Sequence, residues 1–257
     1  MKRVLTIAIL TTSYVISAVE DIGLKKTPGV YFSVEAGASL STKILFAPNW
    51  DLMGVTEHSW TPPVSDSFET NFGTNKCIGA IIGYQFNPII SAEFSYDYRG
   101  KFRSIRAYGP TTDTTHGEVY SINCISSQTV MANMQSSPDV SWGGFVPYIL
   151  GGIGVAINKT GELRNYDVYN QAVPISFDTR LRGKTCHSFA WQVGLGAHYL
   201  LSKHWQIGLG YRYIDIGKLV TSEYYTEVLT QQTGTVLPFI AKHPGFNEIL
   251  ASLVYCF

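Results

Sequence analysis

The most regular feature of the chain is a strict alternation of apolar and polar residues between Ile90 and Arg99. Successive side chains of a β-strand point to opposite faces of a sheet, so a strand places the two kinds of residue on separate faces. One face carries Ile90, Ala92, Phe94, Tyr96 and Tyr98, and the other carries Ser91, Glu93, Ser95, Asp97 and Arg99. The pattern predicts a strand with one apolar and one polar face.

The same period of two recurs elsewhere. Clear alternation covers residues 29–40, 77–86, 188–199, 205–213 and 248–257. The segment 117–134 is less regular, because Ser126 and Gln128 disturb its phase, and we expect a bulge there. The segment 147–157 is so rich in glycine that its pattern does not decide which face is which. These segments together predict eight strands.

The connections between the expected strands alternate strictly in length. The short ones cover residues 87–88, 135–141 and 202–204, and the long ones cover 41–74, 100–117, 158–184 and 217–245. Transmembrane β-barrels have short periplasmic turns and longer extracellular loops. We therefore predict an all-β fold, an eight-stranded antiparallel up-and-down transmembrane β-barrel. Residues 247–257 should pair with residues 29–40, because an open sheet edge leaves backbone groups unsatisfied in lipid.

Alternation alone does not say which face meets lipid. A soluble lipocalin-type barrel, the alternative, is apolar inside and charged outside. The polar faces here carry almost no lysine, which is unusual for a solvated exterior and suits a narrow lumen. The apolar faces end in the aromatic residues typical of the two interfacial girdles, namely Tyr96, Tyr98, Tyr199, Trp205, Tyr211, Tyr213 and Tyr255. The membrane phase is the better interpretation.

Composition supports strands and excludes a nucleic-acid partner. Of 257 residues, 15% are charged and 13% aromatic, and 24 are glycine. The 19 Lys and Arg balance the 19 Asp and Glu, so the chain has no basic field to attract nucleic acid. The longest weakly polar run, Phe145–Ile157, is shorter than the roughly 20 residues that a transmembrane helix needs.

The N-terminal segment has the pattern of a signal peptide. Lys2 and Arg3 precede an apolar run, Val4–Leu10, and the small residue Ala18 offers a cleavage point. We expect a signal peptide over residues 1–18 and one barrel domain over residues 19–257. An uncleaved membrane anchor is the alternative.

Three segments resemble a known family. Phe189–Lys218 is similar to a strand–turn–strand signature of small bacterial outer-membrane β-barrels, the surface-antigen group that includes the opacity proteins and the membrane domain of outer-membrane protein A. Val146–Asn158 resembles that group's glycine-rich strand, and Asn247–Phe257 its closing strand. The resemblance implies location in the outer membrane of a Gram-negative bacterium. It also implies that Leu253, Tyr255 and Phe257 form the C-terminal signal read by the barrel-insertion machinery.

Six charged residues fall on inward faces: Glu35, Glu93, Asp97, Arg99, Arg212 and Glu248. The interior of an eight-stranded barrel is just wide enough for side chains to fill, so these charges must pair or be hydrated. We favour a plug of ion pairs that holds the barrel closed. The alternative is a gate or a narrow ion path.

Candidate catalytic and metal chemistry is weak. Only His187 and Ser188 bring a base next to a nucleophile, and neighbours on a strand point to opposite faces. His198 faces inward among glycines, where packing or hydration suits it better than catalysis. We expect no catalytic residues, no metal site and no cofactor. The four cysteines, Cys77, Cys124, Cys186 and Cys256, are interpreted as buried free thiols, with disulfides as the alternative.

The long loops carry many aromatic residues, and recognition usually lies in loops on a rigid scaffold. Trp50, Trp60, Tyr224 and Tyr225 are the candidate contacts. The alternative is that these aromatics only pack into a cap. We predict a non-enzymatic surface protein with a structural or adhesive role. A small passive channel for ions or apolar small molecules is the alternative. The expected partners are outer-membrane lipid and lipopolysaccharide, the insertion machinery during assembly, and an unidentified extracellular or host-surface ligand.

Overall fold

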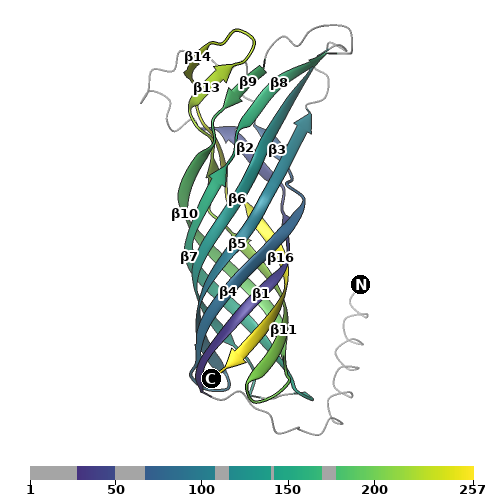
Figure 1. Ribbon diagram of the computed structural model, residues 1–257, viewed down its shortest axis with the longest axis vertical. Coiled ribbons are helices and arrows are strands. Elements are labelled where there is room, and N and C mark those ends of the chain that lie inside the picture. The colour runs from purple at the N-terminus through teal and green to yellow at the C-terminus, as the bar shows by residue number, and fades with distance from the viewer. Residues whose placement is uncertain (1–27, 50–66, 108–115, 140–141, 170–177) are drawn as a thin grey trace, which may run out of the picture.

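The structure is a computed structural model that describes residues 28–49, 67–107, 116–139, 142–169 and 178–257. Eight long strands form a closed antiparallel barrel, which confirms the predicted fold class (Figure 1). They are β1 (Gly29–Ser41), β4 (Thr74–Gln85), β5 (Ile90–Ala107), β6 (His116–Ser136), β7 (Phe145–Thr160), β10 (Lys184–Leu200), β11 (Trp205–Asp215) and β16 (Gly245–Cys256). The expected signal peptide lies outside the described residues.

The last strand closes the barrel against the first, in the expected register. Leu40 pairs with Asn247, Tyr31 pairs with Cys256, and the amide of Phe257 donates to the carbonyl of Val30 at 3.1 Å. Closure satisfies backbone groups that would otherwise be unpaired in hydrocarbon. No helix within the described ranges is long and apolar enough to cross a bilayer.

The apolar faces of the strands point outward. Phe94 is 65% exposed and Leu209 is 64% exposed, although both are large apolar side chains. Their neighbours in sequence on the other face, such as Ser95 and Asp97, are buried. The glycine-rich strand β7 follows the same phase, with Ile149 and Ile153 exposed. A water-soluble barrel would bury these side chains instead.

The bulge expected at Ser126 and Gln128 is not at these residues. Both continue the regular alternation of β6, and Gln128 accepts a hydrogen bond at 3.1 Å from the hydroxyl of Tyr96 on the neighbouring strand. The register between β5 and β6 shifts instead from Arg99 to Phe102 and again from Phe102 to Ser104. Two polar residues on the outward face therefore disturbed the sequence pattern without disturbing the strand.

The long connections contain strands of their own, which corrects their interpretation as loops. The additional strands are β2 (Ile44–Pro48), β3 (Phe68–Thr70), β8 (Leu163–Tyr169), β9 (Asp178–Leu181), β12 (Lys218–Val220), β13 (Tyr224–Glu227), β14 (Thr233–Thr235) and β15 (Phe239–Lys242). β8, β9, β13 and β14 continue the sheet from β6 and rise beyond one end of the barrel (Figure 1). β12, β15, β2 and β3 form a separate four-stranded sheet.

The two ends of the barrel are distinct. The C-terminus and the tight connections 86–89 and 201–204 lie at one end of the barrel (Figure 1). All the additional strands lie in the connections at the opposite end. By the rule of short periplasmic turns, the end with the additional strands is the extracellular one. We call it the outer end.

An apolar core fills the outer end. Phe46 of β2 stacks on Phe68 of β3 with ring centroids 5.2 Å apart, and Phe68 stacks on Tyr120 of β6 at 4.7 Å. Phe102 of β5 packs against Phe246 of β16 at 5.2 Å. The same cluster contains Ile44, Phe72, Ile122, Ile125, Leu163, Ile214, Ile216, Leu219, Val236 and Ala241. The four-stranded sheet thus closes the outer end through apolar contacts.

Candidate functional site in the barrel interior

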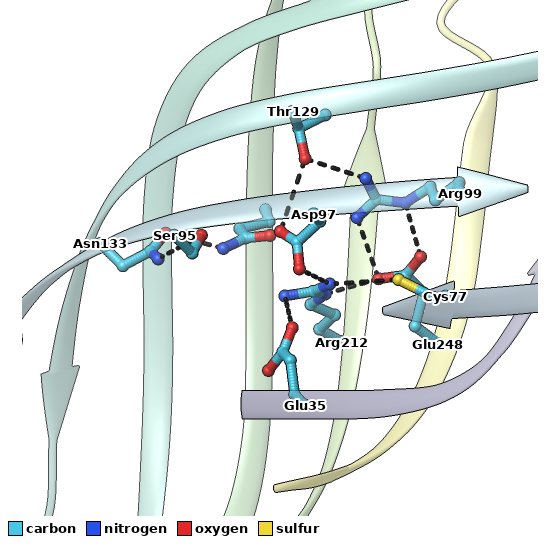
Figure 2. A network of polar contacts seen from close by, with 10 residues as sticks. Glu35, Cys77, Ser95, Asp97, Arg99, Thr129, Asn133, Arg212 and Glu248 are labelled. Atoms are coloured by element: carbon cyan, nitrogen blue, oxygen red, sulfur yellow. Dashed lines mark hydrogen bonds and ion pairs between the residues drawn. The ribbon is translucent and has the colours of Figure 1, made fainter. Parts of the chain in front are cut away.

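A network of ion pairs crosses the interior of the barrel (Figure 2). Arg99 on β5 holds Glu248 on β16 in a bidentate pair, with Nε 2.6 Å from Oε1 and Nη2 3.1 Å from Oε2. Both side chains are 0% exposed. Two parallel hydrogen bonds from a guanidinium to a carboxylate fix the orientation of both groups.

Arg212 on β11 is the centre of the network and contacts three carboxylates. Its Nη1 lies 2.8 Å from Oε1 of Glu35, its Nη2 lies 2.9 Å from Oδ1 of Asp97, and its Nε lies 2.5 Å from Oε2 of Glu248. Glu248 therefore links Arg212 to Arg99. Five of the six inward charges expected from the sequence are brought together.

Glu93 does not join these five. It lies on β5, four residues before Asp97, and accepts a hydrogen bond at 2.6 Å from the hydroxyl of Tyr31 on β1. Four strand residues span about 13 Å, which is too far for the arginines to bridge while bound to their own partners. The sequence pattern does not distinguish Glu93 from Asp97 and Arg99, because all three lie on the inward face of β5.

Several polar residues that the sequence analysis did not single out complete the network. Thr129 on β6 accepts from Nη1 of Arg99 at 2.9 Å and donates to Asp97 at 3.5 Å. Asn133 lies four residues after Thr129 on the same face of β6. It donates to Ser95 at 3.1 Å and accepts from Gln192 on β10 at 2.7 Å. Their inward phase on β6 was the available signal. These contacts extend the polar layer across the barrel.

Gly79 on β4 makes room for the network. In the sheet it pairs with Glu35 on one side and Asp97 on the other. A Cβ atom at this position would collide with the carboxylate of Asp97 and contact Glu35. The missing side chain lets two acids from strands on either side approach the same arginine.

The histidines and cysteines show packing. His198 is buried and stacks on Tyr148 with centroids 4.6 Å apart. His187 is exposed and Ser188 half-buried. The described residues include no group of His, Cys, Asp and Glu that could hold a metal ion. None of the four thiols is in a disulfide, and only Cys77 is buried, whereas Cys124, Cys186 and Cys256 are half-buried.

The candidate recognition residues divide into three groups. Trp50 and Trp60 lie outside the described residues. Tyr225 packs against the apolar core of the outer end. Tyr224, its neighbour on β13, points the other way and is exposed. Other aromatic residues of the long connections, such as Phe46 and Phe68, are buried in the apolar core of the outer end.

An ion pair orders the strands beyond the barrel. Arg164 on β8 donates to both oxygens of Asp178 on β9, at 2.7 and 2.8 Å. These hydrogen bonds hold the pKa of Asp178 below its ordinary value. Arg180 lies 3.6 Å from the same carboxylate. The pair is in the strands outside the membrane-spanning part of the barrel.

The three residues expected to form the C-terminal signal lie on the outward face at the periplasmic end. Leu253 pairs with Val34 and Ile207, and Tyr255 packs edge-on against Trp205 at 4.9 Å. Phe257 is 74% exposed and contacts Tyr255 at 5.1 Å. They form a continuous apolar strip at the base of the barrel.

The sequence matches, over residues 26–257, a family model described as the outer membrane protein beta-barrel domain. The fold is similar to that of OprG from Pseudomonas aeruginosa, with 14% identity, a TM-score of 0.50, and 92% of this chain and 100% of that chain covered. Neisserial surface protein A is similar at 14% identity and a TM-score of 0.44, with 89% of this chain and 97% of that chain covered. A search of curated proteins finds no match.

A third structure, Ail of Yersinia pestis in complex with the heparin analogue sucrose octasulfate, is similar at 10% identity and a TM-score of 0.33, covering 88% of this chain and 99% of that chain. At such identities the likeness of solved structures concerns the fold alone.

Proposed function

The chain belongs to the outer-membrane β-barrel family and lies in the bacterial outer membrane, and from that premise we propose that it is a closed, non-enzymatic surface protein. The barrel anchors the strands of the outer end, and these perform a structural or adhesive role. The observation that carries this proposal is the occlusion of the interior at two levels.

The first level is the ion-pair network. Arg99, Asp97 and Glu248 are completely buried, and Arg212 is nearly so. Buried ion pairs with satisfied hydrogen bonds are costly to break, since removing one partner leaves an unpaired charge. Opening this level for ions would require several such contacts to separate together.

The second level is the apolar core of the outer end. Phe46, Phe68 and Phe102 fill the space above the network, contributed by β2, β3 and β5. Burial of such aromatic side chains is stabilising by about 1.5–3 kcal/mol each. A passive channel for ions would have to displace these rings as well as the charges.

The proposal of a non-enzymatic role rests on the use of the polar residues. Three interior carboxylates, those of Glu35, Asp97 and Glu248, bind arginines. Glu93 accepts a hydrogen bond from Tyr31, and His198 packs on Tyr148. In a catalytic site a base would lie within hydrogen-bond reach of a nucleophile. His187 and Ser188 lie on opposite faces of β10.

A conductance measurement tests closure. The purified full chain, refolded and inserted into planar bilayers, should show no steady open events, whereas a general porin in the same bilayers conducts. Swelling of liposomes containing the chain in solutions of small apolar solutes provides the second measurement. Steady conductance or swelling would favour the small passive channel and overturn the closed-barrel proposal.

An adhesion measurement separates the two roles of a closed surface protein. Tyr224 and Leu229 are exposed beyond the barrel and are suited to contact a surface. Cells that produce Tyr224→Ala with Leu229→Ala should adhere less to cultured epithelial layers than cells with the native chain. Leu201→Ala, at the periplasmic end, is the matched control. Equal adhesion of all strains would leave the structural role.

We infer that residues 1–18 direct export, that the insertion machinery reads the C-terminal strip, and that lipopolysaccharide surrounds the outer end. N-terminal sequencing of the membrane-extracted protein tests the first of these. A mature chain starting near Val19 is expected, and a retained Met1 would indicate an uncleaved anchor instead.

A further inference from the structure

Three lysines form a row on the outward face of the barrel. Ser126 on β6 is the reference point, because it pairs with Lys159 on β7 and lies opposite the bulge of β5 that contains Lys101. On the far side of β5, Lys76 on β4 precedes Cys77, which pairs with Arg99. All three lysines are exposed. We call Lys76, Lys101 and Lys159 the lysine row.

The lysine row lies where the outward apolar surface of the barrel, the apolar belt, ends. On the side toward the turns 86–89 and 201–204, the next outward side chain of each strand is apolar or aromatic: Ile78 for Lys76, Tyr98 for Lys101 and Ile157 for Lys159. The row is on the side of the belt toward the outer end, away from the turns 86–89 and 201–204. In an outer membrane this position is the headgroup layer of the outer leaflet.

No carboxylate of the described residues is paired with the lysine row. β4, β7 and β10 contain no acidic residue, and the two acids of β5, Glu93 and Asp97, point into the barrel. The acid of β6, Glu118, is eight residues from Ser126 along the strand, and Glu162, just after β7, lies 3.9 Å from Arg180. None of the three lysines forms an ion pair with a residue that the structure describes. Neighbouring strands are about 4.8 Å apart. Lys76 and Lys101 lie on neighbouring strands, and Lys101 and Lys159 lie on either side of β6, so an anion between them would reduce the repulsion among the three cations.

We propose that the lysine row binds the phosphate groups of the outer-leaflet glycolipid, with the hydroxyl of Ser126 as an additional donor. The long lysine stems can lie along the apolar belt and present their ammonium groups at the headgroup level. Basic clusters at this depth bind anionic lipid headgroups. Lipopolysaccharide is already an expected partner, and the proposal assigns its phosphate contacts to the lysine row. The proposal rests on the outer-membrane location alone.

A lipid-binding measurement on the full chain tests the proposal. Fluorescent lipid A with both phosphates is titrated into the refolded protein in mild detergent, and dephosphorylated lipid A with the same acyl chains is the comparison. The native chain should bind the phosphorylated lipid at least about tenfold more tightly, since each lysine near a charged headgroup contributes about fivefold. Equal affinity for the two lipids would overturn the proposal.

Two charge-matched variants locate the site. Lys76→Gln, Lys101→Gln and Lys159→Gln together should lose the preference for phosphorylated lipid A. The control combines Lys43→Gln, Lys203→Gln and Lys218→Gln, which removes three exposed cations outside the row, and should keep that preference. An equal loss in both variants would show that net charge, not the row, attracts the lipid. Heat-dependent migration in electrophoresis verifies that each variant is folded.

The outcome is independent of the proposed surface role. A chain that conducts ions but prefers phosphorylated lipid A would contradict the closed barrel and support the lysine row. A closed chain without that preference would do the reverse.

Discussion

Arg99 and Glu248 lie 149 positions apart in the chain and meet inside the barrel, with Nε 2.6 Å from Oε1. Their strands, β5 and β16, are separated in the sheet by β4 and β1. The contact therefore crosses the interior and ties together strands that share no backbone hydrogen bonds. It joins the first part of the chain to its last strand.

Breaking this pair should destabilise the barrel strongly. Arg99→Met leaves the buried carboxylate of Glu248 with one arginine instead of two, and we expect a loss of about 3–5 kcal/mol in the free energy of unfolding. Urea unfolding in lipid vesicles measures it. Adding Glu248→Leu should cost less than the sum of the single changes, because the unpaired charge is then removed.

An exposed ion pair serves as the control for the variants of Arg99 and Glu248. Lys43 and Glu69 lie 3.5 Å apart and are both well exposed. Glu69→Gln should change the free energy of unfolding by less than about 1 kcal/mol. A similar cost for the buried and the exposed pair would contradict the structural role of the network.

The space left by Gly79 should be required. Gly79→Ala places a methyl group against the carboxylate of Asp97, and overpacking of this kind costs about 1–3 kcal/mol. Gly151→Ala on β7 is the matched control, because a Cβ atom there meets nothing within 4 Å. Unfolding in lipid vesicles should separate the two variants. Equal stability would mean that the carboxylates move aside at no cost.

The outward phase of β11 predicts a strong effect at Leu209. This side chain pairs with Ala251 and Ala197 near the middle of the sheet and faces hydrocarbon. Leu209→Arg should destabilise by about 2–4 kcal/mol if it lies at the bilayer midplane. The folded fraction in lipid is the measurement, and Leu209→Met is the apolar control. An unchanged folded fraction would show that the phase is wrong.

The period of two predicts the eight strands because side-chain alternation in a strand is a local property. It also predicts the faces of the strands, except that of the glycine-rich segment 147–157. Closure of the barrel is predicted because the first and last strands, residues 29–40 and 247–257, would otherwise leave backbone groups unpaired in lipid. The partners inside the barrel were not predictable in the same way. Whether Glu93 meets an arginine or Tyr31 depends on the stagger between strands, which a single strand's pattern does not contain.

The outer end was predicted least well, again for a physical reason. β2 and β3 are short, and their buried residues pack against β5, β6 and β15. Burial alternates along β2, but its sequence, Ile44–Pro48, is apolar throughout and shows no period of two. The pattern therefore predicts a loop at Phe46 and Phe68. The predicted position of the bulge is wrong because Ser126 and Gln128 are polar residues on an outward face, where the pattern leads one to expect apolar residues.

The outer strands should respond to acid. The pKa of Asp178 is lowered by the hydrogen bonds from Arg164, so the pair stabilises the folded strands above the ordinary carboxyl pKa of about 3.9. This contribution is lost as the pH falls through the lower folded value. Hydrogen–deuterium exchange, corrected for intrinsic rates, should show β8 and β9 losing protection below about pH 4.

Asp178→Asn provides the comparison for the acid response. It removes the charge at every pH, so its protection at neutral pH should be lower than that of the native chain, and the two should converge in acid. Glu69→Gln, which lies on another strand, should behave as the native chain does. A native-like pH profile in Asp178→Asn would assign the acid response to other groups.

The last prediction concerns Phe257. Its amide donates to Val30, and its ring extends the strip formed with Tyr255 at the periplasmic end. As a girdle residue the ring contributes at most about 1.5–3 kcal/mol by burial, so deleting Phe257 should weaken refolding into lipid vesicles only modestly. If the strip is the signal for insertion, the same deletion in cells should cause a large loss of assembled protein.

The comparison of the two settings separates these roles, because only the cell contains the insertion machinery. Phe257→Tyr keeps a terminal aromatic ring and should assemble normally, whereas the deletion should accumulate in the periplasm or be degraded. Heat-dependent migration of outer-membrane fractions measures the assembled amount. Normal levels of the deletion would leave Phe257 with the girdle role alone, since closure between β1 and β16 depends mainly on the backbone pairs from Tyr31 to Ser41.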